Sequence, residues 1–464
     1  MFESVVRNGR VLLPSGLAEV EIGIEDGRVA AVASRDAAIE GANVVDAGGA
    51  LVLPGVIDAH FHCRAPSHAE RETFATGTAA AAAGGVTTVL EMPISVPPTA
   101  NGAVLAERMA LAATEAVVDV GFYCGCGTLD PADIASALDA GAIAFKGFLQ
   151  QVPAGREDEF AGICIPTTAD LVTAFGLLRE TGVPCAFHAE EDEVLRAITA
   201  RLQREGRRAP SVHAESRPRF VEALSVAKLV VLAEEFGVHV HVPHVSSGHA
   251  VRLIRDAKER GVPITAETCP QYLVFSAEDL DRVGPYAKCN PPLRGSEDHA
   301  ELWAGLLDGT LDFVATDHSP FVAADKEPGW DDIWAAYPGF PGVEILAGFV
   351  LGSALEGRLP LGDAVDLVTT APARVFGLRG KGAIVPGADA DLTFFDERGT
   401  TTVSVAALAS RGRESARIWE GWSHPGRLVR TISRGVTVAV DGRVVGPPGG
   451  GRVLRRAGTA QLVA

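Results

Sequence analysis

Residues 55–64 read GVIDAHFHCR, and this stretch decides how the rest of the chain is interpreted. A glycine is followed by a short apolar run that ends in two histidines, His60 and His62. Residues i and i+2 of a β-strand project from the same face, so both imidazoles can reach one common partner. A His-x-His pair alone is more often packing or chance than a binding site. The ends of the other predicted strands must therefore decide its meaning.

The segment from about residue 55 to residue 375 alternates short apolar strands with Ala-rich helical stretches, many of which end in Gly. Predicted strands include VTTVLEMP (86–93), AIAFKGF (142–148), PCAFHAE (184–190) and DFVATDHSP (312–320). Roughly eight such units fit this length, which predicts a (β/α)8 TIM barrel, the α/β fold class, rather than an open doubly wound sheet. No G-x-G-x-x-G pattern follows the first strand, which disfavours a dinucleotide-binding fold.

Both ends of the chain have a different character from the middle. Residues 1–54 and 376–464 contain β-branched runs separated by turn signals, and VRNGRVLL (6–13) resembles VAVDGRVVG (438–446). We therefore predict one small sheet domain built from both termini, beside a barrel domain over residues 55–375. The Gly/Pro-rich stretch 444–461 lacks a Walker lysine and a following helix, so we expect a flexible tail there rather than a phosphate loop.

Composition excludes some classes of function. The formal net charge of −18 argues against binding to nucleic acid or to an anionic membrane surface. The seven cysteines show no CxxC or zinc-finger spacing, which is typical of reduced thiols in a cytoplasmic protein. We find neither a signal-peptide pattern at the start of the given sequence nor an apolar run of about 20 residues, and expect no membrane span.

Several predicted barrel strands end in residues that can bind a metal, and barrel enzymes carry their active sites at these ends. After His60 and His62 come Lys146, His188 and Asp317, one on each of three further strands. The strand HVHVPHVS (239–246) offers His239, His241 and His244, of which we prefer His244 because it lies at the strand end. Together these nitrogen and oxygen donors predict a site for divalent cations such as Zn, with no thiolate needed.

The order of these motifs resembles that of the amidohydrolase superfamily, and within it the cyclic amidohydrolases: allantoinase, hydantoinase/dihydropyrimidinase and dihydroorotase. The matching stretches cover nearly the whole chain. They are PGVIDAHFH (54–62), TGTAAAAAGGVTTVLEMP (76–93), FKGF (145–148), FHAE (187–190), HVSS (244–247), ETCPQYL (267–273), KCNPPLRG (288–295), TDHSP (316–320) and KGAIVPGADADL (381–392). The resemblance implies that residues 55–375 form a catalytic barrel and that the sheet domain of both termini, residues 1–54 and 376–464, is a β-sandwich. It also implies a homo-oligomer, a tetramer in many relatives.

The resemblance implies a binuclear centre that the spacing alone could not suggest. One metal ion would take His60, His62, Asp317 and Lys146, the lysine being carboxylated by CO2 to a carbamate. The second would take His188, His244 and the other carbamate oxygen; Zn is expected, with Mn, Co or Fe as alternatives. Asp317 would orient the attacking water and carry its proton to the leaving nitrogen, which predicts hydrolytic opening of a cyclic amide. The residues alone leave a second interpretation of Lys146, in which its ammonium forms a structural salt bridge instead of a carbamate.

The sequence does not contain the complete set of substrate-specificity residues of any one of these enzymes. EMPISVPPT (91–99), REGRRAPSVHAESRP (204–218) and the CNPPLR and DHSP loops resemble allantoinases, which favours a cyclic ureide as substrate. Two residues depart from that pattern: Gln271 stands in CPQY where CPHY is usual, and Arg64 stands where dihydroorotases bind the substrate carboxylate. Arg64 is either such an anchor or a salt bridge at the rim. The Asn that accompanies it in dihydroorotases is replaced by Ile94, and Gln150 and Gln151 replace the hydantoinase Tyr region.

The candidate substrate-binding residues are therefore Arg64, Ser95, Gln151, Cys289 and Asn290, the last two acting mainly through the main chain of their loop. Two other functions stay open. Some relatives have lost their metal ligands and serve as oligomeric scaffolds, and others hydrolyse acyclic amides such as N-acyl amino acids. All six expected ligands are present here, which disfavours the scaffold, and the PPLR and TCP loops favour cyclic ureides.

Overall fold

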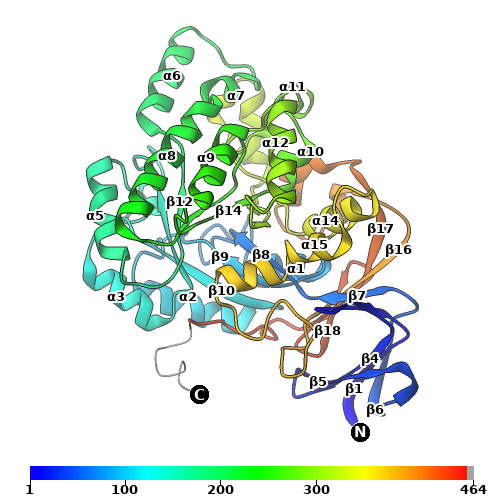
Figure 1. The fold of residues 1–464 in the computed structure, drawn as a ribbon. Coiled ribbons are helices and arrows are strands. Elements are labelled where there is room, and N and C mark those ends of the chain that lie inside the picture. Colours follow the sequence, from blue (N-terminus) through cyan, green and yellow to red (C-terminus); the bar gives the residue numbers. More distant parts are fainter. Residues whose placement is uncertain (457–464) are drawn as a thin grey trace.

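The computed structural model describes residues 1–456, and its centre is a barrel of eight parallel strands (Figure 1). Each strand pairs with the next one along the chain, from β8 to β15. A parallel bridge between Phe61 and His318 joins the first strand to the segment after the last one and closes the ring. The strands are β8 (Val56–Phe61), β9 (Val86–Glu91), β10 (Asp119–Gly125), β11 (Ala144–Phe148), β12 (Cys185–His188), β13 (Val240–Val242), β14 (Ile264–Thr268) and β15 (Phe313–Val314).

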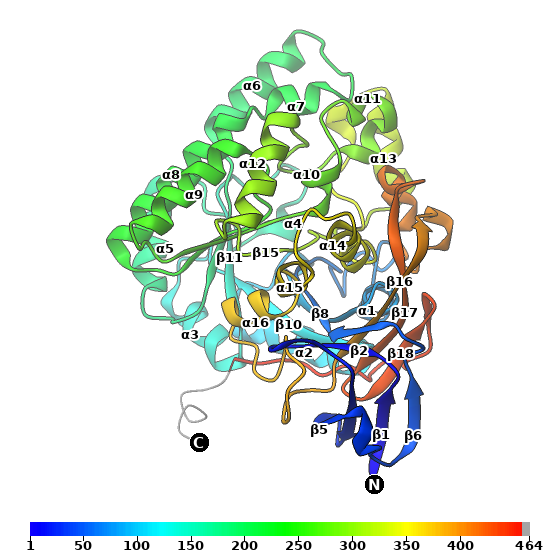
Figure 2. The same ribbon diagram turned by 45° about the vertical axis from the view of Figure 1, so that its right-hand side comes forward.

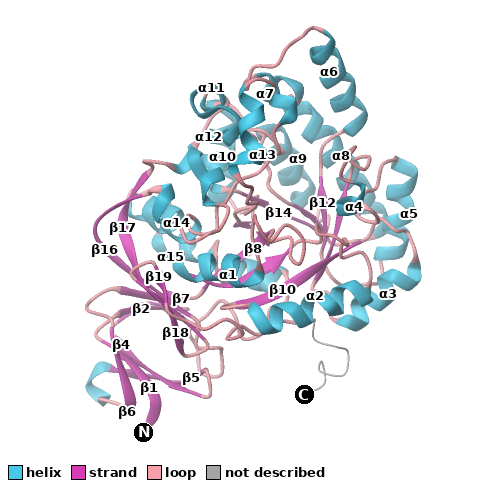
Figure 3. Cartoon of the chain, turned by 180° about the vertical axis from the view of Figure 1, so that it is seen from behind, coloured by secondary structure: helices cyan, strands magenta, loops and turns pink. Residues whose placement is uncertain are grey.

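Helices cover the outside of the barrel, as Figure 3 shows in cyan around the magenta strands. The Thr73 side chain caps the first of them, Asp130 caps another, and Gly141 ends that one in the left-handed conformation that a non-glycine residue adopts at a cost. The main helices are α1 (Phe74–Ala83), α2 (Gly102–Glu115), α3 (Pro131–Ala140), α5 (Thr168–Leu178), α8 (Arg219–Phe236), α9 (Gly248–Glu259), α12 (Ser296–Leu307), α14 (Leu346–Leu355), α15 (Leu361–Asp366) and α16 (Thr370–Val375). The other helices lie in the connections: α4 (Glu157–Phe160), α6 (Asp192–Arg204), α7 (Val212–Ser216), α10 (Pro270–Val274), α11 (Asp279–Val283) and α13 (Ala323–Lys326).

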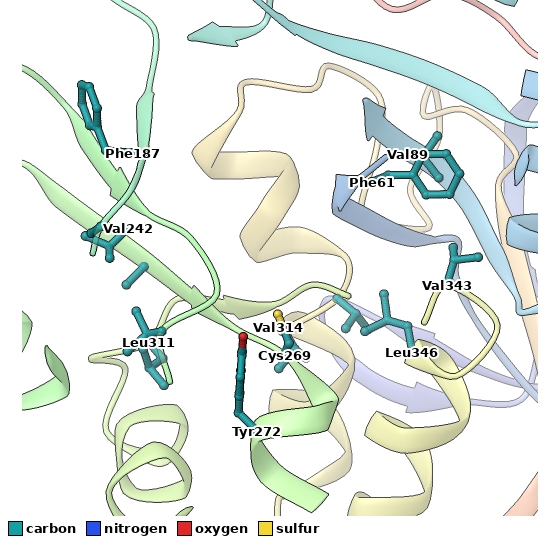
Figure 4. Packing of buried hydrophobic residues seen from close by; sticks show 14 of the residues in the cluster. Phe61, Val89, Phe187, Val242, Cys269, Tyr272, Leu311, Val314, Val343 and Leu346 are labelled. Atoms are coloured by element: carbon teal, nitrogen blue, oxygen red, sulfur yellow. The ribbon is translucent and has the colours of Figure 1, made fainter. Parts of the chain in front are cut away.

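Strand residues that point outward form the main core together with the covering helices. Figure 4 shows part of this core, with Phe61 and Val89 on one side and Phe187 and Val242 on the other. Phe61 is fully buried, and its side chain stacks on the His318 ring at 4.7 Å between ring centroids. Phe61 therefore faces away from the barrel axis, while its neighbours His60 and His62 face inward.

The two chain ends combine in a second unit, which lies below the barrel and along its right-hand side in Figure 2. One sheet contains only N-terminal strands, in the order β5 (Arg28–Ser34), β4 (Val20–Glu25), β1 (Phe2–Arg7) and β6 (Gly41–Asp46). The other sheet mixes both ends, in the order β19 (Arg443–Val444), β18 (Val436–Val440), β17 (Ser423–Ser433), β16 (Leu392–Thr402), β7 (Leu51–Pro54), β2 (Arg10–Leu13) and β3 (Gly16–Ala18). The predicted fold class, a TIM barrel with a β-sandwich formed by both termini, is confirmed.

The stretch after β19 differs from our expectation of a flexible tail. As far as Arg456 it returns to the underside of the barrel, where Val453 forms a parallel bridge with Val120 and the Leu454 amide donates to the Val120 carbonyl at 2.8 Å. The Arg456 amide also donates to the Gly141 carbonyl at 3.1 Å. Glycine and proline content gave no sign of these backbone partners. The rest of the predicted tail, residues 457–461, lies outside the described residues.

A buried ion-pair cluster joins this returning segment, the sandwich and the barrel. The Lys381 ammonium lies 2.7 Å from Asp119, 3.1 Å from Asp389 and 2.5 Å from Asp391. Arg452 of the returning segment pairs with Asp119 at 3.2 Å and also contacts Asp389. The three carboxylates could hold a cation by position, but Lys381 already lies among them. This cluster is therefore a structural clamp between the two units.

Candidate active site

A cavity of about 810 Å³ opens at the carboxyl ends of the barrel strands. All six residues that the sequence predicted as metal ligands line it. They come from five different strands or from the loops directly after them: His60 and His62, Lys146, His188, His244 and Asp317. All barrel strands end at the same rim, so residues far apart in the chain meet there. His60 and Asp317, for example, are 257 positions apart.

Three of these side chains converge on one point. The Asp317 Oδ1 atom lies 3.3 Å from His60 Nε2 and 3.2 Å from His62 Nε2. Their donor atoms all lie within 4.8 Å of one another, as ligands of a single ion do. This trio has the two imidazole nitrogens and one carboxylate oxygen that suit a divalent transition metal.

A second pair of nitrogens lies next to this trio. His188 Nδ1 is 3.1 Å from His244 Nε2, and the His244 ring centroid is 5.2 Å from that of His60. His239 and His241, which share the strand segment before His244, do not line the cavity. The structure therefore brings together His244, rather than either of these two, with the other predicted ligands.

Lys146 is fully buried in β11, and its Nζ has no hydrogen-bond partner among the described residues. Burial lowers the pKa of this amine from 10.5 to about 8, although Glu267 and Asp317 favour the charged form. An ammonium group without a close partner is costly in such a place. The chemistry of the site thus fits a lysine that is converted to an anionic carbamate and held by cations.

Burial favours the neutral form, which metal binding requires, in three of the four histidines. Burial lowers the pKa of His60 from 6.5 to about 4, and it lowers the pKa values of His62 and His244 well below 6.5. Each ring is therefore neutral near pH 7 and offers one nitrogen lone pair. In the same place, burial raises the pKa of the Asp317 carboxyl, while the adjacent His60 and Lys146 lower it.

Two buried glutamates orient the histidines. Glu267 Oε1 lies 2.5 Å from His60 Nδ1, and Glu190 Oε2 lies 3.1 Å from His188 Nε2. Each carboxylate fixes one ring nitrogen as the donor and leaves the other free for the cavity. Sequence reasoning did not assign either glutamate a role, although both stand in the quoted stretches FHAE (187–190) and ETCPQYL (267–273). The sequence did contain a sign of each role. Glu190 stands two residues after the predicted ligand His188, and Glu267 stands near the end of the buried strand β14.

Strained backbone also marks the site. Arg64, His244 and Asp317 have positive φ angles of 62°, 43° and 51°, although none is glycine. Such residues are uncommon outside turns and concentrate where function requires a particular side-chain direction. All three side chains point into the cavity from the ends of strands or from the loops after them.

Arg64 is buried in the cavity wall and already has partners. Its Nη2 donates to Ser319 Oγ at 2.6 Å, its Nη1 lies 3.4 Å from Glu159, and its guanidinium stacks over the Phe321 ring at 4.5 Å. Glu159 in turn pairs with Arg156 at 2.6 Å. One carboxylate thus faces two guanidinium groups, so this side of the cavity keeps an excess of positive charge.

The other predicted substrate-binding residues divide into two groups. Asn290 and Gln151 line the cavity, Gln151 as an exposed residue at its mouth. Ser95 and Cys289 do not: the Ser95 hydroxyl donates to the Pro97 carbonyl at 2.6 Å, and the Cys289 side chain is buried behind its loop. At the unusual position Gln271, the side-chain amide donates to the Thr316 carbonyl at 3.1 Å, next to Asp317.

One wall of the cavity rests on two buried lysines that sequence reasoning did not assign. Lys288 Nζ donates to the carbonyls of Ile333 and Ala336 at 2.7 and 2.6 Å, and Lys326 Nζ donates to the Tyr337 carbonyl at 2.8 Å. Residues 334–339 of this segment line the cavity. The chain has only six lysines, and two of them therefore shape this wall.

A barrel of this kind, with four histidines, a lysine and an aspartate at the strand ends, defines a hydrolase of the metal-dependent barrel class. Residues 51–438 match the model of the amidohydrolase family, and the chain belongs to that family. It is 37% identical over 456 residues to an allantoinase of Rubrobacter xylanophilus and 32% identical over 459 residues to an L-hydantoinase of Paenarthrobacter aurescens. The alignments cover 97% of both chains in the first case and 98% of both in the second.

Solved structures agree with this assignment. The L-hydantoinase (dihydropyrimidinase) of Arthrobacter aurescens superposes with a TM-score of 0.93 at 32% identity, over 98% of this chain and all of that one. A D-hydantoinase follows with a TM-score of 0.90 at 30% identity, covering 98% of this chain and 99% of its own. The family expected from the sequence motifs is therefore confirmed. Among the described residues, no helix has the length and apolar character needed to cross a membrane.

Proposed function

We propose that this enzyme hydrolyses a ring amide bond of a cyclic ureide, with allantoin as the first candidate substrate, in purine breakdown. The observation that carries the proposal is that all six predicted ligand side chains line one cavity, and that one of them, the fully buried Lys146 amine, has no hydrogen-bond partner among the described residues. Allantoinases with 37% identity over almost the whole chain support the choice of ring.

Two divalent ions fit these side chains. His60, His62 and Asp317 would hold one, His188 and His244 the other, and a carboxylated Lys146 would bridge them. We expect Zn, with Mn, Co or Fe as alternatives. When bound, such a pair acidifies a water molecule and polarises the amide carbonyl.

The chain's own residues supply the remaining steps. Asp317 Oδ1 lies at the centre of the ligand cluster, where it can orient the attacking water and accept its proton. The protonated Asp317 then donates to the ring nitrogen as the amide bond breaks, so this nitrogen leaves as a neutral ureido N–H group. Asn290 and the main chain of its loop hold the ring amide beside this point, and Gln151 lies at the mouth.

A hydantoinase, dihydropyrimidinase or dihydroorotase activity is the second candidate. The observation that favours an acidic ring is the pair Arg64 and Arg156, which share the single carboxylate of Glu159 in the cavity wall. The ligand set is complete, which speaks against a scaffold without catalysis. By family resemblance we further propose a homotetramer in the cytoplasm that acts on a small molecule.

The test is ring opening by protein loaded with metal in the presence of bicarbonate. Allantoin, dihydroorotate, hydantoin and dihydrouracil are compared by kcat/KM. A preference for allantoin is the expected result. Faster opening of dihydroorotate would instead favour the acidic ring, and no hydrolysis of any of the four rings would refute the proposal.

A further inference from the structure

We infer that Arg217 is a positioning residue that holds one half of the proposed metal centre in place through Glu190 and His188. This inference rests on the proposed function, because it concerns the second of the two proposed ion sites. Arg217 follows α7 and lines the cavity, and its side chain is 14% exposed.

The chain of contacts starts at the guanidinium group. Arg217 Nη1 donates to Glu190 Oε2, and the same oxygen lies 3.1 Å from His188 Nε2. The other Glu190 oxygen, Oε1, has no hydrogen-bond partner among the described residues. Glu190 therefore depends on Arg217 for its position. With Nε2 bonded to that carboxylate, His188 presents Nδ1 to the cavity, 3.1 Å from His244 Nε2.

The backbone of Arg217 is itself fixed. Its amide donates to the Ala214 carbonyl at 3.2 Å, and its carbonyl accepts from the buried Arg294. Arg294 also donates from Nε to Ser246 Oγ at 3.1 Å, directly after the loop that carries His244. Both histidines of the second site are thus tied to Arg217 and Arg294, whereas the His60 and His62 side chains form their hydrogen bonds and ion pairs with Glu267 and Asp317.

Arg217 has a second partner on the substrate side. The Asn290 amide satisfies both of its ends when its oxygen faces Arg217 Nη2, 3.3 Å away, and its nitrogen faces the Cys289 carbonyl, 3.0 Å away. A guanidinium group can serve both contacts because its N–H donors diverge in one plane, which the single ammonium of lysine cannot reproduce. One residue therefore connects the proposed ring-binding loop with the ion-binding side chains.

The experiment compares metal affinity at the two sites in Arg217→Met, Arg217→Lys, Glu190→Gln and wild type. Zn is titrated into metal-free protein in the presence of bicarbonate, and competition with a chromophoric chelator reports both affinities. Loss of an orienting partner of a ligand histidine typically weakens binding by about 10- to 100-fold. We expect this loss at one site only in Arg217→Met, a smaller loss in Arg217→Lys, and an unchanged first site. Arg219→Met is the matched control, since Arg219 lies two residues away and pairs on the surface with Glu297.

The outcomes separate the inference from the proposed function. If wild type binds two ions and Arg217→Met binds both with the same affinities as wild type, the inference is overturned while the proposed function stands. Wild type that binds no metal would overturn the proposed function. Equal weakening of both sites would mean a general structural role and would also count against the inference; Glu190→Gln repeats the comparison if Arg217→Met does not fold.

Discussion

Replacing Lys146 by methionine should stabilise the metal-free protein while it removes metal binding. The fully buried amine has no hydrogen-bond partner among the described residues, and burial lowers its pKa from 10.5 to about 8. Methionine fills a similar volume without a charge. At pH 7, the shift of the pKa corresponds to a gain of about 3 kcal/mol in the free energy of unfolding, at about 1.4 kcal/mol per pKa unit.

The pH dependence has a definite sign. The folded-state pKa lies below the unfolded value, so the unfolded state binds the extra proton between about pH 8 and pH 10.5. The stability of metal-free wild type should therefore rise with pH across this window, and the advantage of Lys146→Met should shrink to nothing near its upper end. Lys288 and Lys326 also have lowered pKa values, but they are present in both proteins and cancel in the difference.

The assay is urea unfolding of chelated protein in CO2-free buffer at several pH values, with Lys228→Met as the control at a partly exposed lysine that pairs with Glu191. A Lys146→Met protein that is less stable than wild type at pH 7, or whose difference from wild type does not change with pH, would refute the reasoning. It would mean that the Lys146 ammonium finds compensation in the folded chain.

Three further outcomes follow from the site and the clamp. Lys146→Ala should lose bound metal and activity, with partial recovery on addition of a short carboxylate; full activity without additive would contradict a bridging carbamate. Arg64→Met should lower kcat/KM for an acidic ring more than for a neutral one, because it removes one of two guanidinium groups around Glu159; equal losses would assign Arg64 a structural role. Lys381→Met should cost about 3–5 kcal/mol of stability, read from urea unfolding, because it leaves buried carboxylates without their ammonium; a change below about 1 kcal/mol would show that Arg434 and Arg452 are enough to neutralise them.

The sequence was sufficient for the parts of the site that follow a repeating rule. The His60 and His62 side chains could be placed on one face because strand residues alternate, and the barrel places each strand end at the same rim. Lys146 was conspicuous because lysine is rare in this chain and the surrounding segment is apolar. These signals lie either in the pattern of a short segment or in the composition of the whole chain, and none needs a particular pair of distant residues to be known.

The missed parts depend on partners far apart in the chain. Glu267 contacts a histidine 207 positions away, and no local pattern gives that pairing. Ser95 was expected to contact substrate, but the hydrogen bond to Pro97 directs its hydroxyl away from the cavity. The Gly/Pro-rich stretch after residue 444 was misjudged for the same reason, since its backbone pairs with residues near Val120 in the barrel.

The mixed sheet of the sandwich also has a consequence for biosynthesis. Strand β7 ends at Pro54, but its antiparallel partner begins at Leu392, so one edge of β7 stays open while the intervening barrel is translated. At about 5–20 residues per second, this interval lasts roughly 20–70 seconds. An unpaired apolar edge of this kind is open to association with other nascent chains. We therefore expect the yield of soluble protein to depend on chaperones that shield the emerging N-terminal strands.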